Sequence, residues 1–459
     1  MQIINPATEA VIADVAVDTS DSVTAKLARL RRAQPAWAAR PLSERLATIA
    51  AFRERVRGEV DALALTLTRE MGKPIGQAKG EINALVADGG RLDFFLRESE
   101  AALADREVHR DGTLVETIVS EPLGVVANIS AWNYPWFVGS NAFVPALIAG
   151  NAVAYKPSEH TTLTGLKMAA LLHASGVPED VFVPLVGAGE VGRALVEAPV
   201  DGVFFTGSYA TGKAIVKALS NRMLKVQLEL GGKDPTYVMD DADPEAAAES
   251  LADGAMYNAG QSCCSVERIY VHEAIAHTFI EAFIATVRGF VIGDPEDPRT
   301  YLGPLARADQ LEVLATQVRD AVARGAVLAL GGGRITDQAK GYWFEPTVLL
   351  NVDHGMQVMR EESFGPIIGI QIVKDDDQAL ALMNDTAYGL TAGVYGRDEA
   401  RARRILGRVQ SGSVYFNCCD RVSPRLPWSG RGHSGSGTTL STAGIQTFTQ
   451  PKAWHFRGA

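Results

Sequence analysis

The chain has 459 residues, 47% of them apolar and 21% charged, so it can bury a large core and form about two to four domains. Its 44 basic and 54 acidic residues give a net charge of -10, which argues against general binding to nucleic acid or to an anionic membrane. Small molecules or other proteins are therefore the expected partners.

The first residues, MQIINPATEAVIADVAV, do not resemble a signal peptide, since Glu9 and Asp14 interrupt their apolar character. The longest apolar region, 132–153, is broken by proline, glycine and asparagine and would not span a bilayer comfortably. The cysteines form two adjacent pairs, Cys263-Cys264 and Cys418-Cys419, and neither a disulfide framework nor a metal-ligand spacing is visible. We therefore expect a cytoplasmic protein without a membrane segment or a metal site.

Residues 20–104 are rich in alanine, leucine, arginine and glutamate, with apolar residues at helical spacing, which predicts a set of surface helices. The segment 105–121 alternates apolar and polar residues around Asp111-Gly112, which is typical of a β-hairpin. Residues 447–457 are also extended and amphipathic. We expect 105–121 and 445–459 to pair as an oligomerisation arm of a homodimer or homotetramer.

After Pro122, short continuous apolar runs alternate with segments of helix-forming composition. The runs are 125–129, 152–155, 181–186, 202–205 and 225–229. Strands of this kind are buried on both faces, which predicts a doubly wound parallel sheet covered by helices. Residues 1–104 and 122–230 would form this α/β nucleotide-binding domain.

The same alternation continues beyond Glu229 and predicts a second α/β domain over 231–444. Its expected strands are 236–239, 268–272, 367–373, 392–395 and 414–417, and its helices include 275–287 and 310–323.

Two glycine-rich turns compete as the binding site for cofactor phosphates. Gly187 to Gly192 matches GxGxxG after a strand, but no acidic ribose partner follows about 20 residues later. The second turn, Phe205 to Gly212, places the N–H groups of Gly207 and Ser208 at a helix start, where a pyrophosphate can bind. We favour the second turn.

Cys263 stands in the segment YNAGQSCCSVERIY, just before an expected strand. Taken alone, such a cysteine is more often a small buried hydrophobe than a nucleophile. Other motifs must decide between the two interpretations.

A set of motifs resembles the aldehyde dehydrogenase superfamily, in the right order and across nearly the whole chain. The motifs are WNYP (132–135), KPSE (156–159), FTGS (205–208), ELGGK (229–233), GQSC (260–263) and EESFGP (361–366). The resemblance implies a nucleotide-binding domain, a catalytic domain over 231–444, and oxidation of an aldehyde to its carboxylic acid with NAD(P).

The resemblance also implies the catalytic roles. Cys263 would add to the aldehyde to give a thiohemiacetal and then a thioester. The Asn133 side chain and the Cys263 backbone N–H would hold the oxyanion. Glu229 would activate the water that hydrolyses the thioester. Because members that pass the acyl group to coenzyme A typically lack this acid, a free carboxylic acid is the expected product.

For the cofactor, the resemblance places Lys156 and Glu159 on the adenosine ribose, Ser208 on the pyrophosphate, Glu362 on the nicotinamide ribose and Phe364 beside the ring. The Glu159 carboxylate would repel a 2'-phosphate, so NAD is favoured, with NADP as the alternative. The other expected cofactor residues are Ile129, Trp132, Ser158, Phe205, Gly207, Leu230 and Gly231.

Some positions depart from the family pattern. Ala142 and Thr439 stand where many relatives have a lysine and a glutamate that are often assigned to a proton path. Asn141 replaces the arginine of many semialdehyde-specific relatives, which argues against succinic semialdehyde.

Candidates for the substrate pocket indicate a hydrophobic or aromatic aldehyde, although large residues there are as often simple core. Arg421 is the exception, because it could pair with an acidic substrate tail or be a solvated loop arginine. The candidates are Trp136, Phe137, Tyr257, Ser262, Cys264 and the segment Asp420-Arg421-Val422.

Two other classes of protein fit the sequence less well. A cysteine hydrolase would need a histidine base, and none lies in the matched motifs. A non-catalytic binding protein on this scaffold is disfavoured by the joint presence of Cys263, Asn133 and Glu229.

Overall fold

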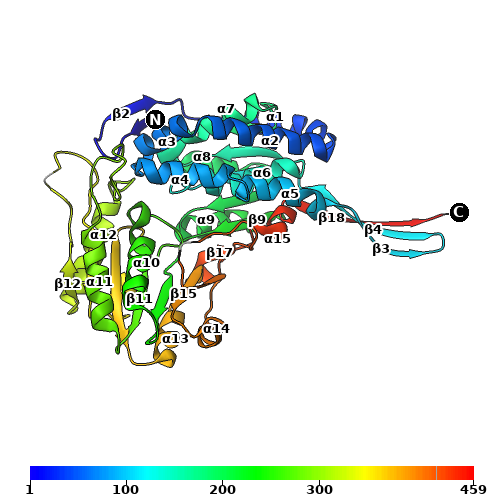
Figure 1. Cartoon of the computed structure of the whole chain (residues 1–459). Coiled ribbons are helices and arrows are strands. Elements are labelled where there is room, and N and C mark those ends of the chain that lie inside the picture. Colours follow the sequence, from blue (N-terminus) through cyan, green and yellow to red (C-terminus); the bar gives the residue numbers. More distant parts are fainter. Residues whose placement is uncertain (337, 420, 459) are drawn as a thin grey trace.

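The computed structural model describes residues 1–336, 338–419 and 421–458 (Figure 1). It begins with a short antiparallel pair, after which the chain is helical. The elements are β1 (Gln2–Ile4), β2 (Val11–Asp14), α1 (Ser20–Ala38), α2 (Leu42–Gly58), α3 (Val60–Met71), α4 (Ile75–Val86) and α5 (Arg91–Leu103). In α2, Ile49, Phe52 and Val56 are fully buried, as their helical spacing requires. The predicted helices of residues 20–104 are present.

The first lobe is built on a six-stranded sheet in the order β17-β9-β8-β5-β6-β7. Its strands are β5 (Val125–Ile129), β6 (Ala152–Lys156), β7 (Phe182–Pro184), β8 (Gly202–Thr206), β9 (Lys225–Glu229) and β17 (Gly435–Ser436). Between them lie α6 (Pro135–Ile148), η1 (Glu159–Thr161), α7 (Thr162–Ala174), α8 (Gly189–Glu197) and α9 (Tyr209–Leu219). All strands except β17 pair in parallel, so the predicted parallel-sheet domain is confirmed.

The second lobe has a seven-stranded sheet in the order β12-β13-β14-β11-β10-β15-β16, parallel except at the β12 edge. Its strands are β10 (Pro235–Val238), β11 (Arg268–His272), β12 (Val327–Leu330), β13 (Thr347–Leu350), β14 (Ile367–Val373), β15 (Thr391–Tyr395) and β16 (Ser413–Phe416). Its helices are α10 (Pro244–Met256), η2 (Tyr257–Gly260), α11 (Ala276–Arg288), α12 (Gln310–Ala323), η3 (Gln357–Met359), α13 (Asp376–Asn384) and α14 (Glu399–Leu406).

The chain returns to the first lobe before the expected domain boundary at residue 444. After η4 (Gly432–Ser434), β17 joins the first sheet, and Leu440 lies in the first lobe's core together with Ile445 of α15 (Ser441–Gln446). The short, glycine-rich return has no apolar periodicity, which is why the sequence does not reveal it.

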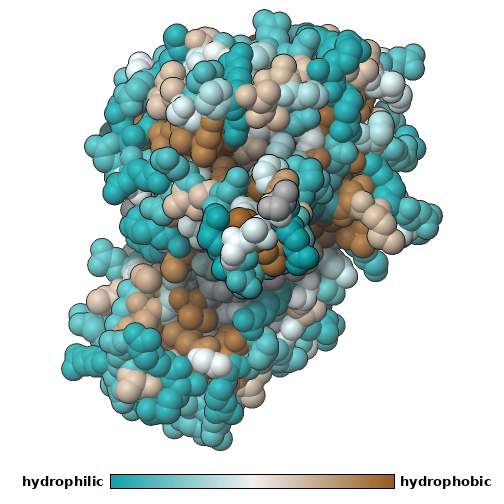
Figure 2. Space-filling model, turned by 90° about the vertical axis from the view of Figure 1, so that its right-hand side faces the viewer, coloured by the Kyte–Doolittle hydropathy of each residue, from teal (hydrophilic) through white to brown (hydrophobic). Residues whose placement is uncertain are grey.

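An arm of three strands projects from the body (Figure 1). The hairpin of β3 (Arg106–Asp111) and β4 (Leu114–Pro122) pairs antiparallel with β18 (Thr449–Arg457), as expected. Figure 2 faces this side and shows hydrophobic patches on the body around the projecting arm. In the described part of the chain, no helix is both long and apolar enough to cross a membrane.

Candidate active site

A cavity of about 650 Å³ contains the three predicted catalytic residues, Asn133, Glu229 and Cys263. The carboxyl ends of the parallel strands of the first sheet meet at this cavity, which is where open α/β sheets place their ligands. The predicted cofactor residues line the same cavity: Ile129, Trp132, Lys156, Ser158, Glu159, Phe205, Gly207, Ser208, Leu230, Gly231, Glu362 and Phe364. The topology thus brings together segments that lie far apart in sequence.

Both glycine-rich turns reach the cavity, although the sequence favoured only the second of them as the phosphate-binding site. α8 begins at Gly189, and Gly189 and Gly192 line the wall. α9 follows Ser208, whose Oγ accepts the Thr211 N–H at 3.3 Å as a helix cap. Two helix starts therefore face one cavity, an arrangement suited to binding phosphate groups.

Lys156 and Glu159 lie together at the end of β6. The Lys156 Nζ is 3.5 Å from the Glu159 Oε2 and donates a hydrogen bond to the Pro157 carbonyl oxygen at 3.0 Å. Burial raises the pKa of Glu159, but the Lys156 ammonium, a backbone hydrogen bond and the nearby His160 together lower it by more, so this pKa lies below its ordinary value. Glu159 is therefore ionised at neutral pH.

Glu362 closes the turn that follows β9. Its Oε1 accepts the Gly232 N–H at 3.0 Å, and a Cβ at Gly231 would collide with its carboxylate. Burial raises the pKa of Glu362 to about 8, with the neighbouring Glu267 carboxylate acting in the same direction. The next aromatic residue, Phe364, meets Trp132 edge-on with ring centroids 5.4 Å apart.

Cys263 follows a tight left-handed turn. Asn258 and Gly260 have φ values of 55° and 68°, and a Cβ at Gly260 would collide with the Gly365 carbonyl. The Asn258 side chain donates to Gln261 O at 3.1 Å and to Asn133 O at 3.3 Å. These bonds tie the cysteine turn to the Asn133 loop, and Cys263 itself is partly exposed.

A buried ion pair that the sequence did not reveal supports the Asn133 loop. Lys73 pairs with Glu81 and donates to the Asn133 carbonyl at 2.7 Å, while Glu81 accepts the Trp136 N–H at 2.9 Å. The hydrogen bonds to Asn133 end on its backbone carbonyl, so its side-chain amide is not engaged by the described residues. Because the lysine lies 60 residues earlier, no local signal reveals this contact.

Glu229 ends β9 and is buried. Its Oε1 accepts hydrogen bonds from Gln227 Nε2 at 2.9 Å and from Thr439 Oγ1 at 3.3 Å, whereas Oε2 has no hydrogen-bond partner among the described residues. Burial raises the pKa of Glu229 well above its ordinary value, and the two hydrogen bonds lower it in part.

The candidates for the substrate pocket do not line this cavity. Trp136, Ser262 and Cys264 are buried, and the Ser262 Oγ lies 3.5 Å from the Cys264 Sγ. Tyr257 meets Tyr301 edge-on. These side chains lie next to site residues in sequence, but this nearness does not bring them to the cavity wall.

The two remaining substrate candidates, Arg421 and Phe137, also lie outside the cavity lining. Arg421 is exposed, and Asp420 lies outside the described residues. Phe137 is covered by a buried arginine that the sequence did not single out, Arg91, whose guanidinium carbon lies 3.8 Å from the ring centroid. Arg91 also donates to the Asn141 Oδ1 at 2.9 Å, and Asn141 lines the cavity.

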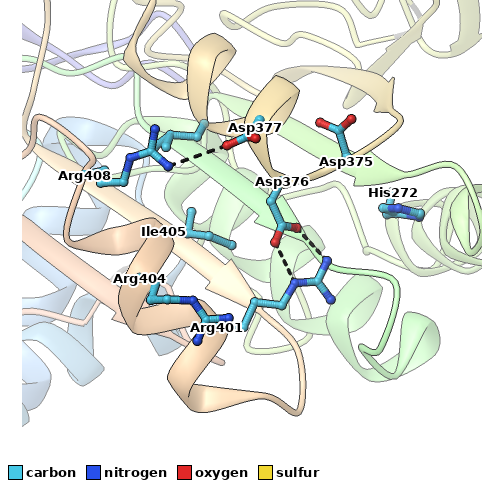
Figure 3. A pocket seen from close by; sticks show the side chains of 9 residues that line it. His272, Asp375, Asp376, Asp377, Arg401, Arg404, Ile405 and Arg408 are labelled. Atoms are coloured by element: carbon cyan, nitrogen blue, oxygen red, sulfur yellow. Dashed lines mark hydrogen bonds and ion pairs between the residues drawn. The ribbon is translucent and has the colours of Figure 1, made fainter.

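A second hollow lies in the second lobe, between α13 and α14 (Figure 3). Arg401 donates two hydrogen bonds of 2.6 Å to Asp376, and Arg408 lies 3.5 Å from Asp377. Two of its arginines thus pair with two of its aspartates, and it contains none of the predicted site residues. Among the described residues, no three His, Cys, Asp or Glu side chains are placed to share a metal ion.

Comparisons with known proteins agree with this geometry. A sequence model described as "Aldehyde dehydrogenase family" matches residues 1–454. The chain is 34% identical over 460 residues to a chloroplastic betaine aldehyde dehydrogenase of Amaranthus hypochondriacus. The alignment covers 98% of this chain and 91% of that protein.

Solved structures are also similar over the whole chain. A 3,6-anhydro-L-galactose dehydrogenase in complex with NAP is 32% identical, with a TM-score of 0.95 over 100% of this chain and 96% of that chain. A betaine aldehyde dehydrogenase from Staphylococcus aureus in complex with NAD+ is 31% identical, with a TM-score of 0.95 over 100% of this chain and 92% of that chain. The chain therefore belongs to the aldehyde dehydrogenase family.

Proposed function

We propose that the protein oxidises an aldehyde to the carboxylic acid with NAD(P), through a thioester on Cys263. The observation that carries this proposal is the meeting of Cys263, Asn133 and Glu229 in one cavity with the expected cofactor residues. A thiol, an amide donor and a carboxyl group are the groups that thioester formation and hydrolysis require. The relatives with related activities support the same reaction class.

The cavity residues fit an NAD(P) molecule. Residues along one side of α8 and of α9, from Gly189 and Ser208 onward, line the cavity, and the missing Cβ of Gly231 leaves room beside Glu362. When bound, the nicotinamide supplies the acceptor for the hydride of the thiohemiacetal. Phe364 and Trp132 would pack beside the nicotinamide ring, and Glu362 would bind its ribose.

The protein's own groups carry the other steps. The Cys263 thiolate adds to the aldehyde carbon, and the oxygen gains negative charge that the Asn133 amide and the Cys263 N–H stabilise, a placement worth about 3 kcal/mol for one donor. Hydrogen bonds to the Asn133 carbonyl fix the backbone from which that amide extends. Glu229 then takes a proton from the water that attacks the thioester, which releases a free acid.

The experiment that tests the function is a panel of aliphatic, aromatic, amino and carboxylated aldehydes, with NADH formation and carboxylic acid both measured. We expect equal amounts of NADH and acid from every aldehyde that is turned over, and the kcat/KM values rank the four classes of substrate. NADH formation without the acid, or no turnover of any aldehyde, would contradict the proposal.

Glu159 favours NAD over NADP, because its ionised carboxylate would repel a 2'-phosphate. In Glu159→Gln we expect the NADP to NAD ratio of kcat/KM to rise about tenfold, equivalent to about 1.4 kcal/mol. Lys156 and Arg193 line the same end of the cavity and would then attract the phosphate. Steady-state kinetics with both cofactors give the ratio. The matched control is Glu190→Gln, on α8 but outside the cavity lining; an equal change there would contradict a specific role for Glu159.

We further propose that the arm joins subunits into a homodimer or homotetramer. Trp454 and Phe456 on β18 are 42% and 60% exposed in the single chain, and patches of this kind mark protein interfaces. We expect Trp454→Asp/Phe456→Asp to sediment as a smaller species than wild type. Val327→Asp, on the far β12 edge, should keep the wild-type size, and an unchanged double variant would count against the arm.

A further inference from the structure

The segment 428–439 folds back against the strand that carries Glu229. β17 pairs antiparallel with β9, which sets Gly435 opposite Glu229. Trp428 and Thr439 exchange backbone N–H to carbonyl bonds of 2.7 and 2.9 Å, which fix the end of the segment. This return delivers the Thr439 side chain to Glu229.

Gln227 reaches the same carboxyl group from β9 itself. Residues two apart on a strand share a face, so Gln227 and Glu229 lie side by side. Gly437 has φ 92°, and a Cβ there would collide with the Gln227 side chain. The glycine in the returning segment thus leaves the room that Gln227 occupies.

The two donors engage only one oxygen of the carboxyl group. Oε1 accepts both hydrogen bonds, which fills the two positions of that oxygen. Oε2 is buried and lacks a hydrogen-bond partner among the described residues, although an unpaired buried oxygen is costly. Glu229 lines the cavity that also contains Cys263.

We propose that Gln227 and Thr439 are positioning residues that hold Glu229 by Oε1, so that Oε2 takes the proton of the water that hydrolyses the Cys263 thioester. The inference rests on the proposed function. In this step the water oxygen bonds to the acyl carbon, one water proton passes to Oε2, and the carbon–sulfur bond breaks. The sulfur leaves with the bonding electron pair as thiolate, and the other water proton stays on the acid.

Both donors favour the ionised carboxylate, which is the form that acts as a base. The groups facing Glu229 are Gln227 from β9, Thr439 from the returning segment and the Cys263 thiol across the cavity. Burial raises the pKa of Glu229, and the two hydrogen bonds lower it in part. Removing one donor raises that pKa further. Hydrolysis should then require a higher pH, while acylation of Cys263 should not.

The test uses p-nitrophenyl acetate, an activated ester that acetylates a reactive thiol without any cofactor. After excess ester is removed, intact mass spectrometry follows the decay of the acetyl-enzyme at a series of pH values. For Thr439→Val we expect the midpoint of the decay profile to rise by about half a pH unit, with decay about threefold slower at the acid end. The rate of acetylation should stay within about twofold of wild type.

Thr439→Ser keeps the hydroxyl and should restore the wild-type profile. Thr438→Val makes the same change one residue away and should leave it unaltered. Gln227→Met removes the other donor and should move the midpoint in the same direction as Thr439→Val, which keeps the test open if one variant fails to fold. If the midpoint moved in neither Thr439→Val nor Gln227→Met, the inference would be overturned, but the proposed function would not. Failure of wild type to form an acetyl-enzyme at Cys263 would overturn the proposed function with it.

Discussion

Replacing Cys263 with alanine is expected to lower kcat for aldehyde oxidation on the order of 10⁴-fold or more, because removing a covalent nucleophile removes the whole chemical route. The side chain is partly exposed and lines the cavity, so its loss should leave the fold intact. NADH formation at saturating aldehyde and NAD measures the effect.

Cys418→Ala is the matched control for this experiment. Cys418 is also a partly exposed free cysteine, but it does not line the cavity. We expect wild-type kcat in this variant, and thermal unfolding should be similar in both alanine variants. If Cys263→Ala were as active as Cys418→Ala, Cys263 would not be the nucleophile.

Glu229→Gln is expected to stop the reaction after the first turnover. The amide cannot take the proton of the hydrolytic water, so the thioester forms but persists. Rapid mixing with aldehyde and NAD should show a burst of about one NADH per active subunit, followed by a steady rate reduced on the order of 10²- to 10⁴-fold.

Glu70→Gln serves as the control for a buried acid. Burial raises the pKa of Glu70 to about 7, and this carboxyl group accepts the Thr164 N–H at 2.9 Å, outside the cavity lining. We expect wild-type turnover in this variant. If Glu229→Gln lost the burst together with the steady rate, Glu229 would act before the thioester rather than after it.

Much of the fold followed from local patterns in the sequence. The strands over 125–129 and 225–229 begin and end at the predicted residues, and so does α12. The expected cofactor residues converge because most of them follow the carboxyl ends of parallel strands, which topology places at one edge of the sheet.

Other features depend on contacts between distant segments. Lys73 supports Asn133 from the connection between α3 and α4, 60 residues earlier, and Thr439 reaches Glu229 from 210 residues later. Nearness in sequence does not fix the direction of a side chain: Cys264 is buried, although Cys263 beside it lines the cavity. Such contacts become visible only when the chain is folded.

The most direct test of the account is to find the acyl group on the protein. Glu229→Gln is mixed with NAD and the best aldehyde of the panel, quenched in acid and analysed by intact and peptide mass spectrometry. The account predicts that the chain gains the mass of one acyl group, carried by the peptide that contains Cys263 and absent from the Glu229→Gln/Cys263→Ala double variant. An enzyme that forms NADH without any acyl adduct, or that carries it on Cys264 or Cys418, would contradict the central role of Cys263.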